Sequence, residues 1–129
     1  MMKKLTAILC AACLMLTAMT GCTKQNNPSQ SGGSGDMIAL ITMDSIDQHW
    51  ITLNEGAQKA AAELGVNVQF MSPNTKDDAQ QIECVNNAVS AGAKAIIVAA
   101  NGPDAISSAL KEAKDKGVKI VYVDSPANV

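Results

Sequence analysis

The sequence predicts an α/β protein built on a parallel, doubly wound sheet, and three observations support this prediction. Four short apolar runs have the length of strands, stretches with apolar residues at helical spacing separate them, and each such stretch ends at a glycine. The expected strands cover 37–43, 66–71, 95–100 and 118–123. The glycines are Gly65, Gly92 and Gly117, at positions where a left-handed residue stops a helix. A β-α-β-α-β-α-β order requires right-handed crossovers in a parallel sheet.

The four apolar runs predict different places in that sheet. The runs 37–43 and 95–100 are continuously apolar or nearly so, which is typical of strands covered on both faces. The runs 66–71 and 118–123 are closer to alternation, which predicts strands nearer an edge or with one face less covered.

Three amphipathic stretches predict the helices between these strands. Their apolar stripes are Trp50, Leu53, Ala57, Ala60, Ala61 and Leu64, then Ala79, Ile82, Val85 and Val89, then Ile106, Leu110 and Ala113. The segment 74–78 offers candidate caps for the second helix. We expect Pro103 and Asp104 to open the third helix, as a helix-entry proline followed by an acidic first turn.

Residues 1–21 have the organisation of an export signal. Lys3 and Lys4 precede an uncharged, largely apolar run of about 15 residues, which is shorter than the roughly 20 that a membrane-spanning helix needs. The run ends in small residues directly before Cys22.

The segment 19–22, Met-Thr-Gly-Cys, resembles a lipobox, after which signal peptidase II would cut and Cys22 would carry diacylglycerol. An ordinary secretory signal is the alternative. Each buried methylene of an acyl chain contributes about 0.8 kcal/mol, so two or three chains would anchor the protein stably. We therefore expect an exported protein held by lipid at Cys22 on the periplasmic side or the outer face of the cell membrane.

The remaining composition divides the chain and limits its function. Residues 22–36 are polar and rich in Gly, Ser, Asn and Gln, as in a flexible linker, and 37–129 form the expected folded domain. Without its signal the chain has an acidic formal charge near −4 and no basic patch, so we expect no nucleic-acid partner. Cys84 would then be the one free thiol, either a small buried hydrophobic residue or a site of pairing between molecules.

Polar, turn-prone segments follow all four expected strands, at the edge where an open parallel sheet binds ligands. They cover 44–50, 72–74, 101–103 and 124–126. The first turn contains no glycine, so a phosphate cradle is not expected there. His49 is the single histidine, and no cluster of metal ligands is visible. The sequence therefore predicts a binding protein without enzymatic activity, cofactor or metal.

The residue types in these segments suit a polyhydroxy ligand. A carboxylate such as Asp47 or Asp124 accepts hydrogen bonds from neighbouring hydroxyls, and each such bond contributes about 1.5–3 kcal/mol. An aromatic face such as that of Trp50 covers the apolar side of a sugar ring. The remaining ligand candidates are His49, Asn101 and Ser125.

Structural roles compete with these assignments. Trp50 fits the apolar stripe of its helix and could instead be a core residue, and Asp47 could instead be the N-cap of that helix. Asn101 is a turn former before Pro103, and Asp44 is better explained as a turn residue. Asp124 has no evident structural duty, which makes it the strongest candidate.

The segments 38–40, 49–50, 53–57, 100–105 and 121–125 resemble the type I periplasmic sugar-binding proteins, the ribose- and galactose-binding group. The resemblance implies a two-lobed protein that closes over a monosaccharide and delivers it to an ABC permease. It maps Asp47, His49 and Trp50 to the first sugar-contacting loop and Asp124 to an aspartate that binds sugar hydroxyls. Ribose binders have arginine after that aspartate, whereas this chain has Ser125, so other pentoses, hexoses or polyols fit the resemblance as well.

The resemblance covers only the first part of one lobe. We therefore expect 37–129 to be an incomplete N-terminal lobe, truncated after Val129. An alternative function is a sensor that presents a sugar-like signal to a membrane histidine kinase. A repressor of the LacI type is not expected, because no helix-turn-helix precedes residue 37. A hydrolytic surface enzyme would have to keep its reactive groups elsewhere.

Overall fold

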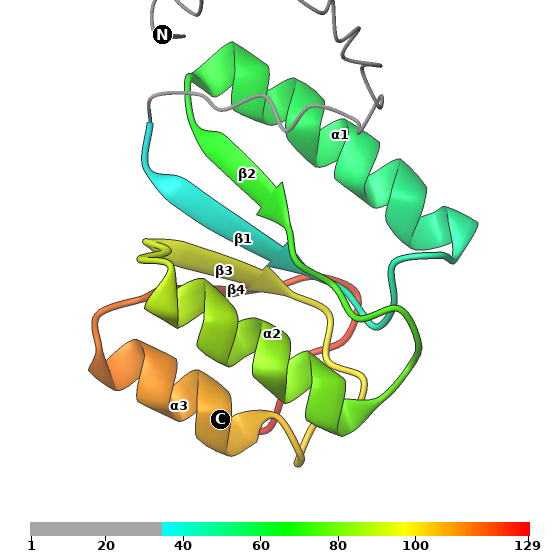
Figure 1. Ribbon diagram of the computed structural model, residues 1–129, viewed down its shortest axis with the longest axis vertical. Helices are drawn as coiled ribbons and strands as arrows, with labels where there is room; N and C mark the ends of the chain where they lie inside the picture. Colours follow the sequence, from blue (N-terminus) through cyan, green and yellow to red (C-terminus); the bar gives the residue numbers. More distant parts are fainter. Residues whose placement is uncertain (1–34) are drawn as a thin grey trace, which may run out of the picture.

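The computed structural model describes residues 35–129 (Figure 1). The predicted signal peptide, the lipidation at Cys22 and almost all of the linker lie outside these residues. In chain order the elements are β1 (Met37–Ile41), α1 (Gln48–Leu64), β2 (Asn67–Phe70), α2 (Asp78–Ser90), β3 (Ala95–Val98), α3 (Ser107–Asp115) and β4 (Lys119–Tyr122). The predicted order of strands and helices is confirmed.

The four strands form one parallel sheet in the order β2-β1-β3-β4. In its register Leu40 lies opposite Phe70 on one side and Ile97 on the other. The nearly continuous apolar runs are the two central strands, and the alternating runs are the two edges, as the sequence predicts. The edge strand β4 exposes Val121 and Tyr122, with 51% and 38% of their surfaces accessible.

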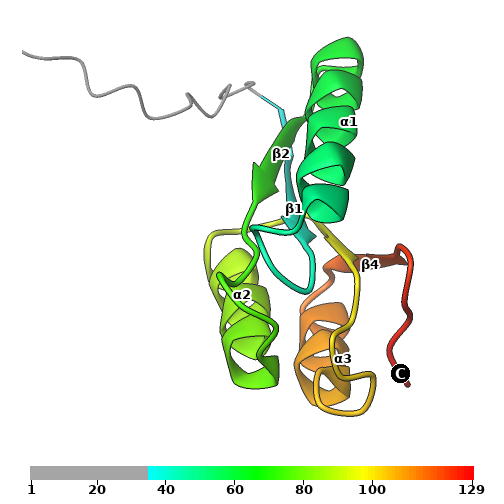
Figure 2. The same cartoon turned by 90° about the vertical axis from the view of Figure 1, so that its right-hand side faces the viewer.

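Helices cover both faces of the sheet. Figure 2 shows α1 on one side and α2 with α3 on the other. Successive residues of β1 point to opposite faces, so Leu40 packs on the side of α1 while Ala39 and Ile41 pack on the side of α2 and α3. This alternation is why the central strands must be apolar at every position.

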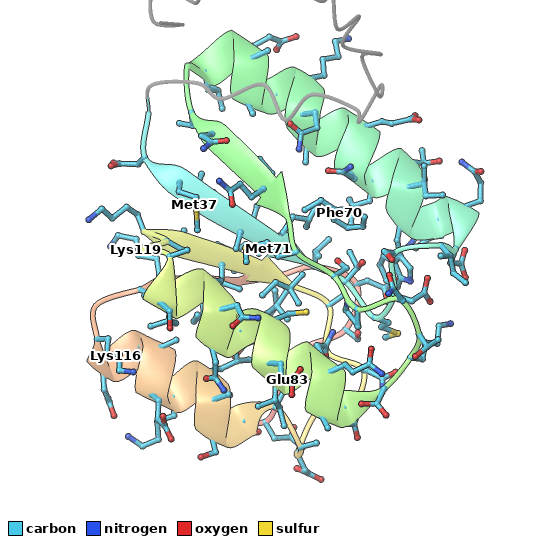
Figure 3. The ribbon with its side chains drawn as sticks, in the orientation of Figure 1. Met37, Phe70, Met71, Glu83, Lys116 and Lys119 are labelled. Atoms are coloured by element: carbon cyan, nitrogen blue, oxygen red, sulfur yellow. The ribbon has the colours of Figure 1, made fainter. Side chains whose placement is uncertain are left out.

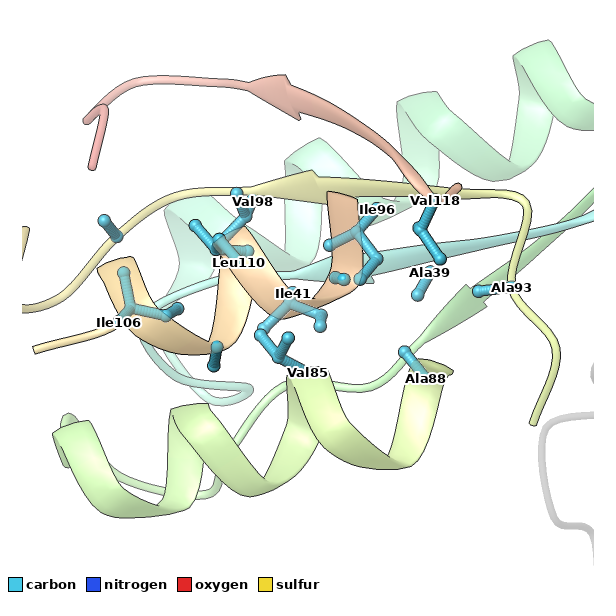
Figure 4. Close-up of a cluster of buried hydrophobic side chains, with 13 residues drawn as sticks. Ala39, Ile41, Val85, Ala88, Ala93, Ile96, Val98, Ile106, Leu110 and Val118 are labelled. Carbon is cyan, nitrogen blue, oxygen red and sulfur yellow. The ribbon is translucent and has the colours of Figure 1, made fainter. Parts of the chain in front are cut away.

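The larger core lies between the sheet, α2 and α3. In Figure 4, Ile41 of β1 lies close to Val85 of α2, and Leu110 of α3 lies beside Val98 of β3. All four side chains are completely buried. Deleting one such buried aliphatic group typically costs about 1–4 kcal/mol, so this layer supplies much of the stability of the fold.

The smaller core lies under α1. Leu40, Ala61 and Val68 are its buried members, and Phe70 packs against them from the end of β2, on the side of α1 (Figure 3). Met37 and Met71 instead pack against the larger core on the opposite face. Among residues 35–129, no helix combines the length and apolar character needed to cross a membrane.

The predicted helix ends are present. Gly65, Gly92 and Gly117 have φ values of 68°, 84° and 86°, the left-handed region that glycine adopts without strain. Within the segment 74–78 the N-cap of α2 is Asp77, whose carboxylate accepts from the Gln80 N–H at 2.8 Å.

The predicted start of the third helix is wrong. Residues 103–106 form turns, and α3 begins at Ser107 without a side-chain cap. In a regular helix the Pro103 carbonyl would accept the Ser107 N–H. Here that carbonyl accepts from the Asn128 N–H at 3.1 Å and from Ser107 Oγ at 2.7 Å, and the Ser107 N–H turns to Asp104. Contact with the segment after β4 therefore delays the helix by one turn.

Candidate functional site

The order of the strands creates a switch point at the carboxyl edge of the sheet. From β1 the chain crosses outward to β2 with α1 on one face, and then returns to β3 and β4 with α2 and α3 on the other. The segments after β1 and β3 therefore diverge to opposite faces, which opens the crevice where such sheets bind ligands. Four of the six predicted ligand residues lie on segments that follow β1, β3 and β4, and the other two, His49 and Trp50, lie in the first turn of α1.

Asp47 is the N-cap of α1. Its backbone is extended, with φ −67° and ψ 132°, and its Oδ1 accepts from the His49 N–H at 3.0 Å. Asp47 therefore has the capping role that the sequence allows beside ligand binding. The cap uses Oδ1, and the side chain as a whole is 46% exposed, with Oδ2 lying 4.0 Å from Lys76 Nζ.

His49 and Asp124 lie together although 75 residues separate them in the sequence. His49 Nε2 is 3.9 Å from Asp124 Oδ1, and both side chains are substantially exposed, at 63% and 48%. The segments after β1 and β4 thus meet above the end of the intervening strand β3.

Asp124 is the one non-glycine residue with a positive φ in the described part of the chain, at 65°. Aspartate is among the few residues that tolerate this region, but the conformation still costs free energy. Such backbone is retained where the surrounding structure imposes it, often at binding sites. It turns the carboxylate toward the crevice edge, beside His49.

Trp50 is buried, with 4% of its surface exposed. Its ring meets that of His49 edge-on, with centroids 4.5 Å apart and planes inclined by 72°. This is the placement expected of a core residue, one of the two roles that the sequence left open. Its contact with a sugar stays a prediction.

Asn101 and Ser125 are both held by neighbouring groups. Asn101 Nδ2 donates to the Asp78 carboxylate at the start of α2. Ser125 Oγ donates to the Ala100 carbonyl at 2.9 Å, and the Ala100 N–H donates to the Ser125 carbonyl at 3.0 Å. Ser125 therefore ties the segment after β4 to the segment after β3.

Asp44 is a turn residue, as the sequence indicates. It is 4% exposed, and its Oδ1 accepts from the N–H groups of Ile46 at 3.0 Å and Asp47 at 2.7 Å. Lys76, after β2, lies 4.0 Å from the carboxylates of both Asp44 and Asp47. These contacts lie in the loop that leads to Asp47 and to the start of α1, which carries His49.

Gln81 is a central residue that the sequence pattern does not predict. It is completely buried on α2, where its amide bonds to backbone groups after β1 and after β3. The predicted buried stripe of this helix consists of apolar residues alone. The buried positions are Gln81, Val85 and Ala88, so a glutamine four residues before a buried valine was the available signal.

Residues 35–129 hold no group of three or more His, Cys, Asp or Glu residues placed to bind a metal ion.

Cys84 is half-buried against the larger core, and burial, followed by the nearby charge of Glu83, raises the pKa of its thiol. This fits the prediction of a small buried hydrophobic residue.

Comparison with known proteins gives relatives of one kind. The ribose import binding protein of Haemophilus influenzae is 29% identical over 98% of this chain, and the D-apiose import binding protein of Actinobacillus succinogenes is 36% identical over 71%. The alignments cover 39% and 29% of those relatives, so the chain spans well under half of their length.

Solved structures agree with this. An ABC transporter solute-binding protein from Agrobacterium vitis, bound to α-D-tagatopyranose, superposes with a TM-score of 0.69 at 27% identity, over 71% of this chain and 31% of its own. A family model, the periplasmic binding protein domain, matches residues 38–129. Its members are transport components without enzymatic activity, and the predicted resemblance is confirmed. The chain belongs to the periplasmic binding protein domain family.

Proposed function

We propose that the protein binds a monosaccharide or polyol outside the cytoplasm and delivers it to an ABC permease in the membrane. The observation that carries this proposal is Asp124, a half-exposed carboxylate in a left-handed backbone conformation at the carboxyl edge of the sheet, 3.9 Å from His49. The names of the relatives refer to ribose and apiose import, and the Agrobacterium protein holds a ketohexose.

The charges at this edge favour a neutral, hydroxyl-rich ligand. Within residues 35–129, the basic side chains beside Asp44, Asp47 and Asp124 are those of Lys76 and His49. An excess of carboxylates repels anions such as sugar phosphates and accepts hydrogen bonds from hydroxyl groups. Sugar contacts are proposed for Asp47, His49, Trp50, Asn101, Asp124 and Ser125.

The membrane location is part of the proposal. A lipid on Cys22, followed by the polar linker to residue 36, would keep the binding domain beside a permease while leaving it free to reorient. Mass spectrometry of protein from the membrane fraction would detect the acyl groups on Cys22. Replacement by Cys22→Ser should remove the acyl mass and release the protein from membranes. Wild-type protein without acyl mass on Cys22 would contradict the lipid anchor.

Sugar binding is tested by thermal unfolding with D-ribose, D-apiose, D-tagatose and myo-inositol. A sugar at about 100 times its Kd raises the free energy of unfolding by about 2.7 kcal/mol, which gives a rise in Tm of several degrees. Asp124→Ala should abolish that rise for the sugar that stabilises the wild type. Equal affinity in the wild type and the variant would remove Asp124 from the site, and no response to any sugar would overturn the proposed function.

A further inference from the structure

Gln81 is a buried amide whose hydrogen-bonding groups are all used by two loops of the site. Nε2 donates to the Thr42 carbonyl at 2.9 Å and to the Ala99 carbonyl at 2.8 Å, and Oε1 accepts from the Asn101 N–H at 2.9 Å. Thr42 follows β1, whereas Ala99 and Asn101 follow β3. One side chain of α2 therefore joins the ends of the two central strands.

These bonds begin where the sheet ladder ends. The last backbone bond between the two segments runs from the Ala99 N–H to the Ile41 carbonyl, at 3.0 Å. Beyond it the chains diverge toward Asp44 on one side and Asn101 on the other. The amide of Gln81 thus sets the distance between the segments at the point where the crevice opens.

Two further side chains extend this connection to the edge strands. Ser72, after β2, accepts from the Thr42 N–H at 2.8 Å, and the two hydroxyl groups are 2.8 Å apart. Ser125, after β4, bonds to Ala100 as described above. The carboxyl ends of all four strands are joined in sheet order, and Gln81 is the central connection.

We propose that Gln81 is a positioning residue for the ligand site: its amide holds the segment that leads to Asp47 and His49 at a fixed distance from the loop carrying Asn101. The sugar-binding part of this inference rests on the proposed function, and the loop-holding part does not. Gln81 has no exposed surface, so its effect on a ligand is exerted through the loops.

The first test is hydrogen exchange of peptides from Gln81→Met, which keeps the length of the side chain and removes its three hydrogen bonds. The matched control is Val85→Ala, one turn further along α2, which weakens the larger core but takes part in none of the three hydrogen bonds. We expect the exchange of peptides spanning 42–47 and 99–105, relative to peptides spanning α3, to rise at least about ten-fold in Gln81→Met. In Val85→Ala this ratio should stay within about two-fold of the wild type.

The second test uses Gln81→Glu and pH. In this variant the ionised carboxylate still accepts from the Asn101 N–H, but it is repelled by the carbonyl oxygens of Thr42 and Ala99. The protonated carboxyl group can donate one hydrogen bond to one of these carbonyls. We expect fast loop exchange at pH 8 that returns toward the wild-type ratio at pH 5, each compared with the wild type at the same pH. Should Gln81→Met fail to fold, this reversal decides the question, and loop exchange that does not change with pH overturns the proposal.

The third test measures binding of whichever of D-ribose, D-apiose and D-tagatose the wild type binds most tightly. Gln81→Met should raise its Kd at least about ten-fold, and Val85→Ala by less than about two-fold. Equal effects of the two variants would reduce Gln81 to a core residue and overturn the proposal. If no sugar binds the wild type, the proposed function fails, and the exchange ratios alone confirm or overturn the loop-holding role.

Discussion

His49 Nε2 and Asp124 Oδ1 lie 3.9 Å apart, and the strands that precede them, β1 and β4, are separated by β3. The two side chains meet above the end of that strand. Exposed ion pairs of this kind contribute about 0–1 kcal/mol to stability, so the pair does little to hold the fold together.

The left-handed backbone conformation of Asp124 costs free energy of folding, and this cost can be measured separately from the proposed ligand role of its carboxylate. Asp124→Gly and Asp124→Ala both remove the carboxylate, but glycine adopts a φ of 65° freely and alanine does not. We expect the glycine variant to be more stable than the alanine variant by about 1 kcal/mol in urea unfolding, and neither to bind sugar. Equal stabilities would contradict the strain, and retained sugar binding would contradict the role.

Asp47 has a capping role that can be separated from a ligand role. Asp47→Ala removes the bond to the His49 N–H and should lower the free energy of unfolding by about 1 kcal/mol. Asp47→Asn keeps a good cap and should stay within about 0.5 kcal/mol of the wild type. Calorimetric titration with sugar then distinguishes the roles: weaker binding by Asp47→Asn supports a ligand contact, and unchanged binding leaves Asp47 as a cap only.

Gly102 lies against the side chain of Asp78. A Cβ at residue 102 would lie 2.6–2.8 Å from the atoms of the Asp78 carboxylate, which is itself bonded to Asn101. Gly102→Ala should therefore cost about 1–3 kcal/mol in denaturant unfolding. The double variant Gly102→Ala with Asp78→Ala should recover part of this cost in a double-mutant cycle. Strict additivity would show that the two positions do not interact.

The sequence predicts the architecture because hydrophobic pattern determines it. Continuous apolar runs mark the central strands, and left-handed glycines mark the helix ends. Ile106, Leu110 and Ala113 are all buried as the spacing predicts. In α1 the apolar stripe predicts burial less well, because only part of this helix packs on the sheet. Leu64, its last residue, is 74% exposed.

The site is less predictable because it depends on contacts between distant segments. Nothing in the local sequence places Asn128 against Pro103, the contact that delays α3, or pairs His49 with Asp124. Gln81 was missed because apolar residues alone defined the stripe of α2. A buried polar side chain must satisfy its hydrogen bonds, so its partners are known only once the fold is known.

The thiol of Cys84 makes the free energy of unfolding depend on pH. Burial, and secondarily the charge of Glu83, raises the pKa of its thiol above the ordinary value of 9.0. As pH rises past that value the unfolded chain loses the thiol proton first, so the folded state holds more protons and its stability falls. We expect the free energy of unfolding, measured with a reductant present, to be constant with respect to this group below about pH 8 and to decline above pH 9.0. Cys84→Ala is the control and should lack that part of the decline, and an identical pH profile in the variant would contradict the raised pKa.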